Sequence, residues 1–303
     1  MKLLHNLIDV HAPSGSEHKM NEFLVHYVKK ECKNWKVEPK ILHGDNFQDA
    51  LILVFGKPST AIFAHMDTVG FTARYENQLV AIGGPSTENG LKLTGEDQLG
   101  PIECQLNVDD NNALSHDFAR AIERGTTLTF KPSLKVTKDY LKGTFLDNRL
   151  GMYSALKVAE SLENGVIVFS CFEEHGGGNV PLLIKYLYEQ YKIKQALISD
   201  ITWVTDGVSH GNGVVISLRD RNIPRKKFID RIVTLAAESG IPCQLEVEGS
   251  GSSDGREIHH SPYPIDWCFI GAPESNVHSP NETVYLSDLY AMINMYQYLM
   301  KKL

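Results

Sequence analysis

Short apolar runs alternate with amphipathic segments along most of the chain. Residues 51–55, 61–64, 166–172 and 196–198 are apolar at nearly every position, a pattern typical of strands that are buried on both faces. Residues 150–162, 180–191, 225–239 and 286–302 instead carry apolar side chains at intervals of three and four, which predicts helices. This alternation predicts an α/β fold in which helices flank a central sheet.

A further helix is expected near the start of the chain. Ser14 is followed three residues later by Glu17, the spacing of a capping box, in which both side chains bond free amides at a helix start. Apolar positions 20, 23, 24, 27 and 28 then share one helical face, and the pattern ends near Cys32. The sequence therefore predicts an amphipathic helix here that packs on the sheet.

Between residues 71 and 141 the pattern changes to short strands separated by turns. Residues 78–82, 91–94, 102–106 and 127–131 are typical of strands, and turn signals such as Asn89-Gly90 separate them. Because the α/β pattern stops at Gly70 and resumes at Gly143, we expect a small β-barrel-like module inserted into an α/β domain. The expected division is residues 1–70 plus 142–303 for the α/β domain and residues 71–141 for the module.

The composition is that of an ordinary folded protein. The 303 residues include 30 Lys and Arg against 37 Asp and Glu, a formal charge of −7, and 42% are hydrophobic. These values exclude disordered, collagenous and coiled-coil chains. The acidic balance provides no electrostatic footprint for nucleic acid, and no apolar stretch approaches the ~20 residues that a membrane helix needs.

Two features bear on the cellular compartment. The first residues lack the apolar core and cleavage site of a signal peptide, so we expect a cytoplasmic protein. The cysteines are odd in number and form no close pair, which predicts free buried thiols at Cys32, Cys104, Cys171, Cys243 and Cys268.

Most of the candidate functional residues, which are histidines and acidic residues, lie where the predicted strands end. Open α/β sheets bind ligands at this edge. Taken singly, Asp147 could be a helix cap and Asp200 a turn residue, but the shared placement of the whole set favours a site. Imidazole and carboxylate donors without thiolates suit zinc, cobalt or manganese. The set comprises His65 and Asp67 after residues 61–64, Asp147 before a helix, Glu173 and Glu174 after a long apolar run, Asp200 after residues 196–198, and His278 in a late loop.

These residues and their neighbours resemble a known family, the di-metal aminopeptidases of the glutamyl-aminopeptidase / cellulase M type, relatives of the TET peptidases. The resemblance spans nearly the whole chain and implies a central mixed sheet flanked by helices, of the phosphorylase/hydrolase-like zinc-exopeptidase type, with an inserted PDZ-like β-barrel. It rests on Ala64-His65-Met66-Asp67-Thr68-Val69-Gly70-Phe71, Leu146-Asp147-Asn148-Arg149, Glu173-Glu174, Ser199-Asp200 and Val277-His278-Ser279-Pro280.

The resemblance implies two divalent metal ions per subunit, of which zinc is the most suitable and cobalt or manganese are alternatives. Asp147 is implied to bridge the two ions. His65 and Asp200 would complete one metal site, and Glu174 and His278 would complete the other.

The resemblance also implies two residues that serve catalysis without binding metal. Glu173 would take a proton from the metal-bridging water and give it to the leaving amine. Asp67 would orient His65 through its second ring nitrogen. A cis peptide bond between Asp147 and Asn148 belongs to the same motif.

Substrates and partners follow from the same resemblance. It implies hydrolysis of the N-terminal peptide bond of short peptides with a free N-terminus, by a homo-oligomer whose inserted module acts in dimerisation or substrate access. His175, Ser253 and Asp254 are candidate substrate-binding residues.

Some family features are absent, and alternatives stay open. Ser275-Asn276-Val277 and Gly211-Asn212-Gly213 stand where relatives carry Arg-Tyr and Gly-Lys-Gly, so the preferred N-terminal residue is open, as is the choice between a dimer and a larger assembly. Related di-zinc carboxypeptidases and amide deacylases also fit residues 65–69, whereas the segment at Asp147 favours an aminopeptidase. A non-catalytic metal-binding scaffold would require a missing base or ligand, and none is missing.

Overall fold

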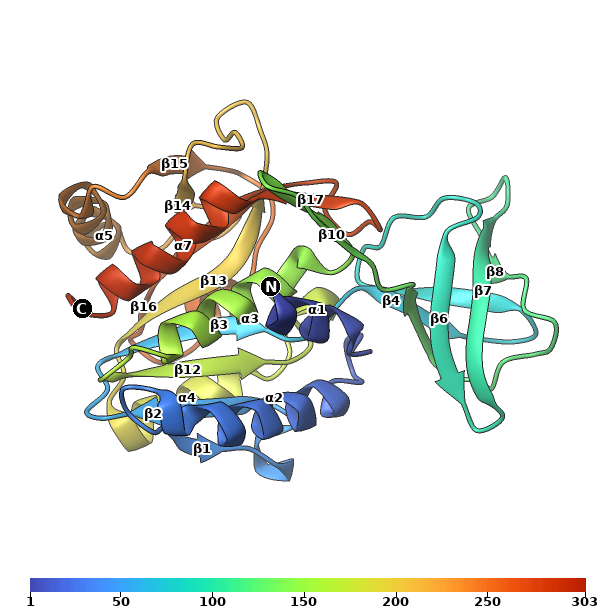
Figure 1. Ribbon diagram of the computed structural model, residues 1–303, viewed down its shortest axis with the longest axis horizontal. Coiled ribbons are helices and arrows are strands. Elements are labelled where there is room, and N and C mark those ends of the chain that lie inside the picture. Colours follow the sequence, from blue (N-terminus) through green and yellow to red (C-terminus); the bar gives the residue numbers. More distant parts are fainter.

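The computed structural model describes residues 1–303, which form an α/β body and a closed β-barrel. Figure 1 shows the barrel projecting from one end of the body, with the C-terminus at the opposite end. None of the helices combines the length and the apolar character needed to cross a membrane.

Helices and strands alternate in the body, whereas the barrel contains strands only. The helices are α1 (Lys2–Asp9), α2 (His18–Glu31), α3 (Leu146–Ala159), α4 (Val180–Tyr191), α5 (Lys226–Ser239), α6 (Gly255–His260) and α7 (Leu286–Leu299), with short 3-10 turns η1 (Cys32–Asn34), η2 (Asp45–Phe47) and η3 (Glu173–His175). The body strands are β1 (Lys40–Leu42), β2 (Leu51–Phe55), β3 (Thr60–His65), β10 (Leu134–Val136), β11 (Tyr140–Gly143), β12 (Gly165–Ser170), β13 (Gln195–Trp203), β14 (Val214–Arg219), β15 (Cys243–Val247), β16 (Asp266–Ser275) and β17 (Glu282–Tyr285). The barrel strands are β4 (Gly70–Ala73), β5 (Gln78–Ile82), β6 (Lys92–Asp97), β7 (Gly100–Val108), β8 (Leu114–His116) and β9 (Thr127–Phe130).

The body sheet is mixed, and four of its strands run parallel with their carboxyl ends at one edge. Its order is β1-β2-β12-β3-β13-β16-β17-β11-β10, with β14 against β16 and β15 against β14. β12 and β13 run parallel to β3 on either side, and β16 runs parallel to β13. Ser170 is paired with His65, so the residues after β12 lie beside the end of β3. The predicted mixed sheet flanked by helices is confirmed.

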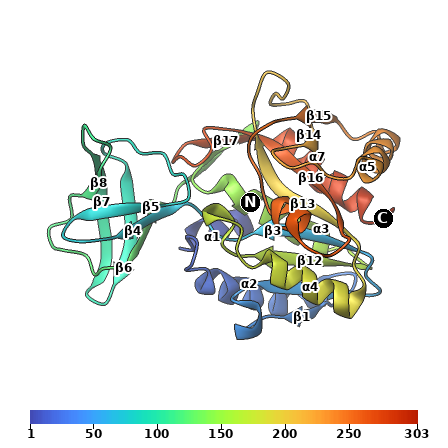
Figure 2. The ribbon, with the colours of Figure 1, turned by 180° about the vertical axis from the view of Figure 1, so that it is seen from behind.

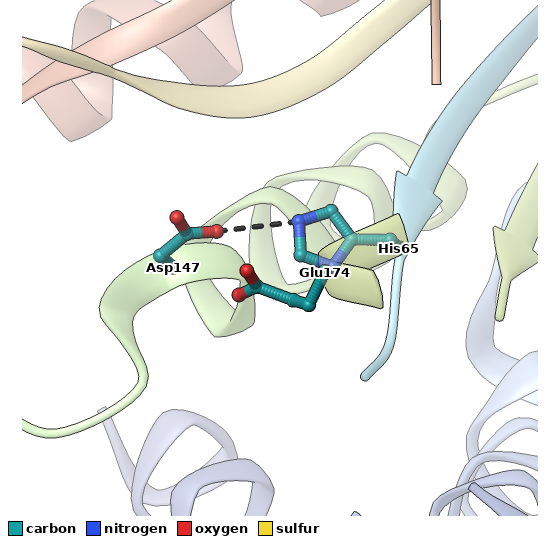
Figure 3. Close-up of side chains that lie close together, drawn as sticks. All are labelled: His65, Asp147 and Glu174. Carbon is teal, nitrogen blue, oxygen red and sulfur yellow. Dashed lines mark ion pairs between the residues drawn. The ribbon is translucent and has the colours of Figure 1, made fainter. Parts of the chain in front are cut away.

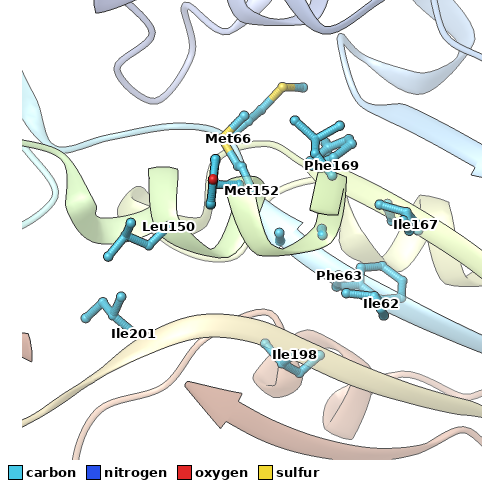
Figure 4. Close-up of a cluster of buried hydrophobic side chains, with 14 of the residues drawn as sticks. Ile62, Phe63, Met66, Leu150, Met152, Ile167, Phe169, Ile198 and Ile201 are labelled. Atoms are coloured by element: carbon cyan, nitrogen blue, oxygen red, sulfur yellow. The ribbon is translucent and has the colours of Figure 1, made fainter. Parts of the chain in front are cut away.

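Helices cover both faces of this sheet and bury its apolar side chains. Figures 1 and 2 show α3 and α7 on one face, with α4 on the other. α6 packs against β16 and α4. The strands predicted to be buried on both faces, β2, β3 and β12, have no exposed residue. Figure 4 shows part of the core, in which Ile62 and Phe63 of β3 lie near Ile167 of β12, and Leu150 of α3 lies near Ile201 of β13. This packing fixes the sheet edge at which the candidate site lies.

The barrel closes in the strand order β4-β5-β8-β7-β6-β9, and all its pairings are antiparallel. Its interior is filled by side chains such as Phe71, Leu93 and Phe130, which are almost completely buried. The predicted inserted barrel is therefore present, although β10 and β11 leave it and join the body sheet. The exact division of the chain at residues 71 and 141 stays a prediction.

The predicted capping box at the start of α2 is wrong, although the helix itself is present. The residue before the helix, Glu17, makes no side-chain capping bond. Its Oε1 instead accepts the N–H of Phe172, and the hydroxyl of Ser14 donates to Asp67. Tertiary partners across the sheet edge have replaced the local capping bonds, because both side chains face the candidate site.

Candidate metal centre

Five separate segments bring the candidate residues to one sheet edge. His65 is the last residue of β3, Glu173 and Glu174 follow β12, and Asp200 lies in β13. Asp147 stands in the first turn of α3, and His278 lies in the loop between β16 and β17. The peptide bond between Asp147 and Asn148 is cis, as expected.

Asp147 lies between the two imidazoles. Its Oδ1 is 3.2 Å from Nε2 of His65, and its Oδ2 is 3.2 Å from Nε2 of His278. Figure 3 shows the first of these contacts and the Glu174 side chain pointing toward the same space. Each oxygen of one carboxylate therefore faces a different histidine.

Two further carboxylates each contact one of these imidazoles. Oε2 of Glu174 is 3.1 Å from Nε2 of His278, and Oδ2 of Asp200 is 3.5 Å from Nε2 of His65. The structure thus groups His65 with Asp200 on one side of Asp147, and His278 with Glu174 on the other.

Asp67 lies behind His65 and is completely buried. Its Oδ1 is 3.5 Å from Nδ1 of His65 and accepts the N–H of Glu173 at 3.1 Å. Its Oδ2 accepts the N–H of Glu174 at 3.0 Å and the hydroxyl of Ser14. This one carboxylate therefore positions both the His65 ring and the turn that carries the two glutamates.

Glu173 faces the cavity without a hydrogen bond to the protein. Its carboxylate lines the same cavity as His65, Asp147 and Asp200, and its nearest cationic partner is Nε2 of His65 at 4.0 Å. A carboxylate with no structural partner beside the cluster is free to exchange a proton with a bound molecule.

Burial and like charge dominate the electrostatics of this cluster. Burial raises the pKa of Glu173 well above its usual value, and Glu174 and Asp200 add to that shift. Burial, followed by the charge of Asp147, raises the pKa of Glu174 to about 7. Burial opposes protonation of His65, but Asp200 and Asp147 outweigh it and raise the pKa of its imidazole. The protein alone leaves several carboxylates crowded at buried positions, which a cation would stabilise.

The residues present fit divalent metal ions. Donor atoms of His65, Asp147 and Glu174 all lie within 4.8 Å of one another. Oδ1 of Asp147 and Oε1 of Glu174 are buried without a hydrogen-bond partner. Because buried polar atoms in folded proteins are normally paired, these orphaned donors indicate an ion-binding cluster. Nitrogen and oxygen donors without thiolates suit zinc, cobalt and manganese.

Two residues that support the cluster were not predicted from the sequence. Glu282 of β17 accepts the N–H groups of Leu146 and Asp147 through Oε2 and that of His278 through Oε1. It therefore ties the start of α3 to the His278 loop. The buried guanidinium of Arg149 donates to the carbonyl of Met66, between the two ends of the His65 to Asp67 segment. The bonds from Glu282 to the start of α3 and from Arg149 to Met66 leave no sequence signal, because each joins segments more than 80 residues apart.

The three candidate substrate-binding residues make contacts within the protein. Ser253 donates to Oδ2 of Asp200 at 2.6 Å, and the Ser170 hydroxyl donates to Asp254. His175 accepts the N–H of Gly83 from the barrel at 3.0 Å. None of the three lines the cavity at the cluster, so contact of these residues with substrate stays a prediction.

That cavity extends from the cluster along the end of β13 and the loops beside it. Besides the cluster residues it is lined by Ile201, Thr202, Trp203, Asp220, Glu246, Glu248, Ser250, Gly251, Ser252 and Phe269.

A comparison with protein-family models identifies the family of this chain. Residues 95–295 match the family model described as M42 glutamyl aminopeptidase. A protein of Acetivibrio thermocellus, provisionally named an aminopeptidase, is 25% identical over 321 residues, which cover 95% of this chain and 94% of the relative.

Solved structures of the same fold cover the whole chain. Aminopeptidase APDkam598 of the archaeon Desulfurococcus kamchatkensis has a TM-score of 0.86 at 20% identity, over 100% of this chain and 94% of that one. The TET1 peptidase of Pyrococcus horikoshii, described as assembling into a tetrahedron or a large octahedral shell, has a TM-score of 0.84 at 18% identity, over 99% and 98%. At these identities the likeness shows the fold.

Proposed function

This chain belongs to the M42 glutamyl aminopeptidase family, and on that premise we propose that it is a metal-dependent aminopeptidase that releases N-terminal residues from short peptides. The observation that carries the proposal is the placement of Asp147 between His65 and His278, with an unpaired glutamate, Glu173, in the same cavity. Geometry of this kind suits hydrolysis at a carbonyl.

The proposed ligands form two sets that share one residue. His65 and Asp200 would hold one divalent ion, Glu174 and His278 would hold a second, and Asp147 would contact both. Zinc suits this donor set best, with cobalt and manganese as alternatives. When bound, such ions polarise the scissile carbonyl and lower the pKa of water.

The protein supplies proton transfer and positioning. Glu173 takes a proton from the attacking water and returns it to the leaving amine, because its carboxylate lines the cavity and no protein donor occupies it. Asp67 holds the His65 ring and the glutamate turn in place through its bonds to both backbone amides. The crowded carboxylates favour a free α-ammonium, which would restrict cleavage to the first peptide bond of the substrate.

We also propose that the inserted barrel limits access to the site. The N–H of Gly83 donates to His175, and Nδ1 of His278 lies 3.2 Å from the carbonyl of Gly84. A Cβ at Gly83 would lie 2.7 Å from the carbonyl oxygen of Glu174, so this barrel loop packs directly on the turn that carries the glutamates. The loop therefore bounds one side of the site.

A homo-oligomer is part of the proposal. It is supported by the shared fold with the Pyrococcus horikoshii TET1 peptidase, which is described as forming closed assemblies. Size-exclusion chromatography with light scattering tests it: a multiple of the chain mass is expected, and a monomer at micromolar concentration would overturn it.

The first experiment is metal removal and reconstitution. Enzyme treated with chelator and then loaded with zinc, cobalt or manganese is assayed on aminoacyl-p-nitroanilides and on N-acetylated peptides. We expect cleavage of the free-amine substrates alone, and only after loading. Cleavage of the acetylated peptides alone would favour the carboxypeptidase or deacylase alternative. No cleavage with two ions bound would favour a metal-binding scaffold.

A further inference from the structure

The cavity beside the cluster carries negative charge well beyond the proposed metal ligands. Asp220, directly after β14, and Glu246 and Glu248, in and after β15, also line this cavity. Asp220 and Glu246 are only 7% and 5% exposed. No lysine or arginine lines the cavity at all.

Within the protein, Asp220 and Glu246 each accept a hydrogen bond through only one of their two carboxylate oxygens. Oδ1 of Asp220 accepts the N–H of Asn222, while its Oδ2 makes no hydrogen bond. Oε1 of Glu246 accepts the hydroxyl of Thr202, and no ion pair reaches either residue or Glu248.

The adjacent arginine, Arg219, forms no ion pair with these carboxylates. Nε of Arg219 donates to the backbone carbonyls of Asp220 and Glu248 rather than to their carboxylates. A nine-tenths buried carboxylate with a free oxygen facing a cavity is costly unless a cation reaches it. Two such groups, Asp220 and Glu246, with the partly exposed Glu248 beside them, therefore indicate a cationic ligand.

Apolar surface leads from the cluster to these carboxylates. Ile201, Trp203 and Phe269 line the same cavity, and the Trp203 indole is half-exposed toward it. Gly251 lies beside the indole, where an added Cβ would be 3.6 Å from the ring. A long alkyl chain can pack on such a wall while its charged end reaches the acids, and the indole face can itself attract a cation.

We propose that this cavity receives the side chain of the substrate's N-terminal residue and that Asp220, Glu246 and Glu248 select lysine or arginine there. The proposal rests on the proposed aminopeptidase function, since it names the substrate class of the same site. Lysine and arginine combine an apolar stem with a cationic end, which matches the two parts of the cavity. A glutamate side chain would be repelled by these carboxylates and would therefore bind more weakly than lysine or arginine.

The test compares side chains that differ in charge but have similar stems. The metal-loaded enzyme is assayed on the p-nitroanilides of lysine, arginine, norleucine and glutamate, all of which carry the same α-amine. We expect kcat/KM for lysine to exceed that for norleucine by at least tenfold, as one favourable charge contact provides. Glutamate is expected to be the poorest substrate. Norleucine cleaved as well as lysine would overturn the proposal.

A binding measurement separates this proposal from the proposed function. L-lysine and L-norleucine, which would be the released products, are titrated into the metal-loaded enzyme by calorimetry. Tighter binding of lysine supports the selective cavity even if no substrate is hydrolysed, in which case the aminopeptidase function alone fails. Equal or weaker binding of lysine overturns the selectivity whatever the turnover.

Variants locate the charge that is recognised. Glu246→Gln and Asp220→Asn keep hydrogen-bonding capacity and are expected to lower the lysine-to-norleucine ratio of kcat/KM about tenfold. Glu238→Gln is the matched control, because Glu238 is exposed on α5 and its loss changes the net charge equally. An unchanged ratio in both cavity variants would contradict the proposal.

Salt dependence of the unaltered enzyme covers the case in which a variant fails to fold. Raising the salt concentration should lower kcat/KM for lysine while leaving that for norleucine nearly constant. Parallel salt responses of the two substrates would count against recognition by charge.

Discussion

Adjacent glutamates in one turn have different surroundings, and this difference separates their proposed roles. Glu174 contacts His278 at 3.1 Å and shares that imidazole with Asp147, so it stands among the proposed ligands. Glu173 makes no hydrogen bond through its carboxylate and reaches only His65, at 4.0 Å. Replacing either carboxylate by an amide removes charge and basicity at nearly constant shape.

Glu173→Gln is expected to keep both metal ions and to lower kcat by about two to four orders of magnitude, since proton transfer is lost. Glu174→Gln is expected to lose one ion, since an imidazole and a shared carboxylate remain as its ligands. Metal content by mass spectrometry and kcat on one aminoacyl-p-nitroanilide separate the two. If both variants retain full metal content and activity, the proposed site is wrong.

Asp67→Asn tests the positioning of the His65 ring. The amide offers one acceptor where the carboxylate now serves two backbone N–H groups and the Ser14 hydroxyl. Metal affinity, measured by competition with a chelator, is expected to fall about 10- to 100-fold. Asp139→Asn, at an exposed position after β10, provides the control and should leave the affinity unchanged. Equal metal affinities of the Asp67 and Asp139 variants would show that Asp67 does not position the metal ligands.

At the scale of elements, one close contact sets how α3 meets β13. The Ser199 hydroxyl donates to the carbonyl of Gly151, and Asn148 donates to the carbonyl of Ser199 at 2.9 Å. The neighbours of these residues are Asp147 and Asp200, so the contact fixes the separation of two proposed ligands. It requires a residue without a side chain at position 151.

Gly151→Ala is expected to push α3 away from the sheet. An added Cβ would lie 2.2 Å from the Ser199 carbonyl oxygen and 2.1 Å from Oδ1 of Asn148. Relief of such overlap costs about 1–3 kcal/mol of unfolding free energy, more than alanine gains in helix propensity. Urea denaturation and chelator competition are expected to show lower stability and weaker metal binding.

Gly207→Ala is the matched control for this substitution. Nothing lies within 4 Å of a Cβ at position 207, and its backbone conformation suits any residue. The control should behave as the unaltered protein does. An α3 variant with unchanged stability and metal affinity would show that the helix position is not set by this contact.

At the scale of the whole molecule, His11 joins the body to the barrel. Its Nε2 lies 2.9 Å from the Thr127 hydroxyl, and its Nδ1 lies 3.3 Å from the Thr129 hydroxyl, both on β9. Burial lowers the pKa of His11 from 6.5 to about 4, and Lys19 and Arg149 contribute to the shift. The imidazole is therefore neutral in the folded protein near pH 5, whereas an unfolded histidine is charged there.

Stability is expected to depend on pH through this group. Above pH 6.5 the imidazole is neutral in both states and its contribution is complete. Between pH 6.5 and 4 the unfolded state binds more protons, so the free energy of unfolding falls, by about 1–3 kcal/mol for this histidine.

His11→Gln is expected to flatten that decline relative to the unaltered protein, measured by urea denaturation at pH 7, 6 and 5. His43→Gln, at an exposed position, is the control and should keep the full decline. Identical slopes for the unaltered protein and the His11 variant would show that this junction does not titrate.

The sequence allowed much of the body and the barrel to be predicted, because local patterns are sufficient for many elements. The predicted ranges of β2, α4 and β5 coincide with the structure, since apolar periodicity and turn residues act over a few neighbours. β14 to β17 were not predicted, although β16 is the long neighbour of β13 in the sheet. The order of strands depends on pairings between distant segments that no local pattern encodes.

The sequence by itself determined which residues follow the buried strands, because strand ends are a local property and open sheets bind ligands there. These positions include all the proposed ligands that follow strands, namely His65, Glu174 and Asp200. Only the tertiary structure decided that Ser14 donates to Asp67 instead of capping a helix, that Glu282 joins the Asp147 and His278 segments, and that Asp220 and Glu246 face one cavity. The physical reason is the same in each case: burial makes an unpaired polar group costly, so its partner is set by what folding brings within reach, whatever the distance along the chain.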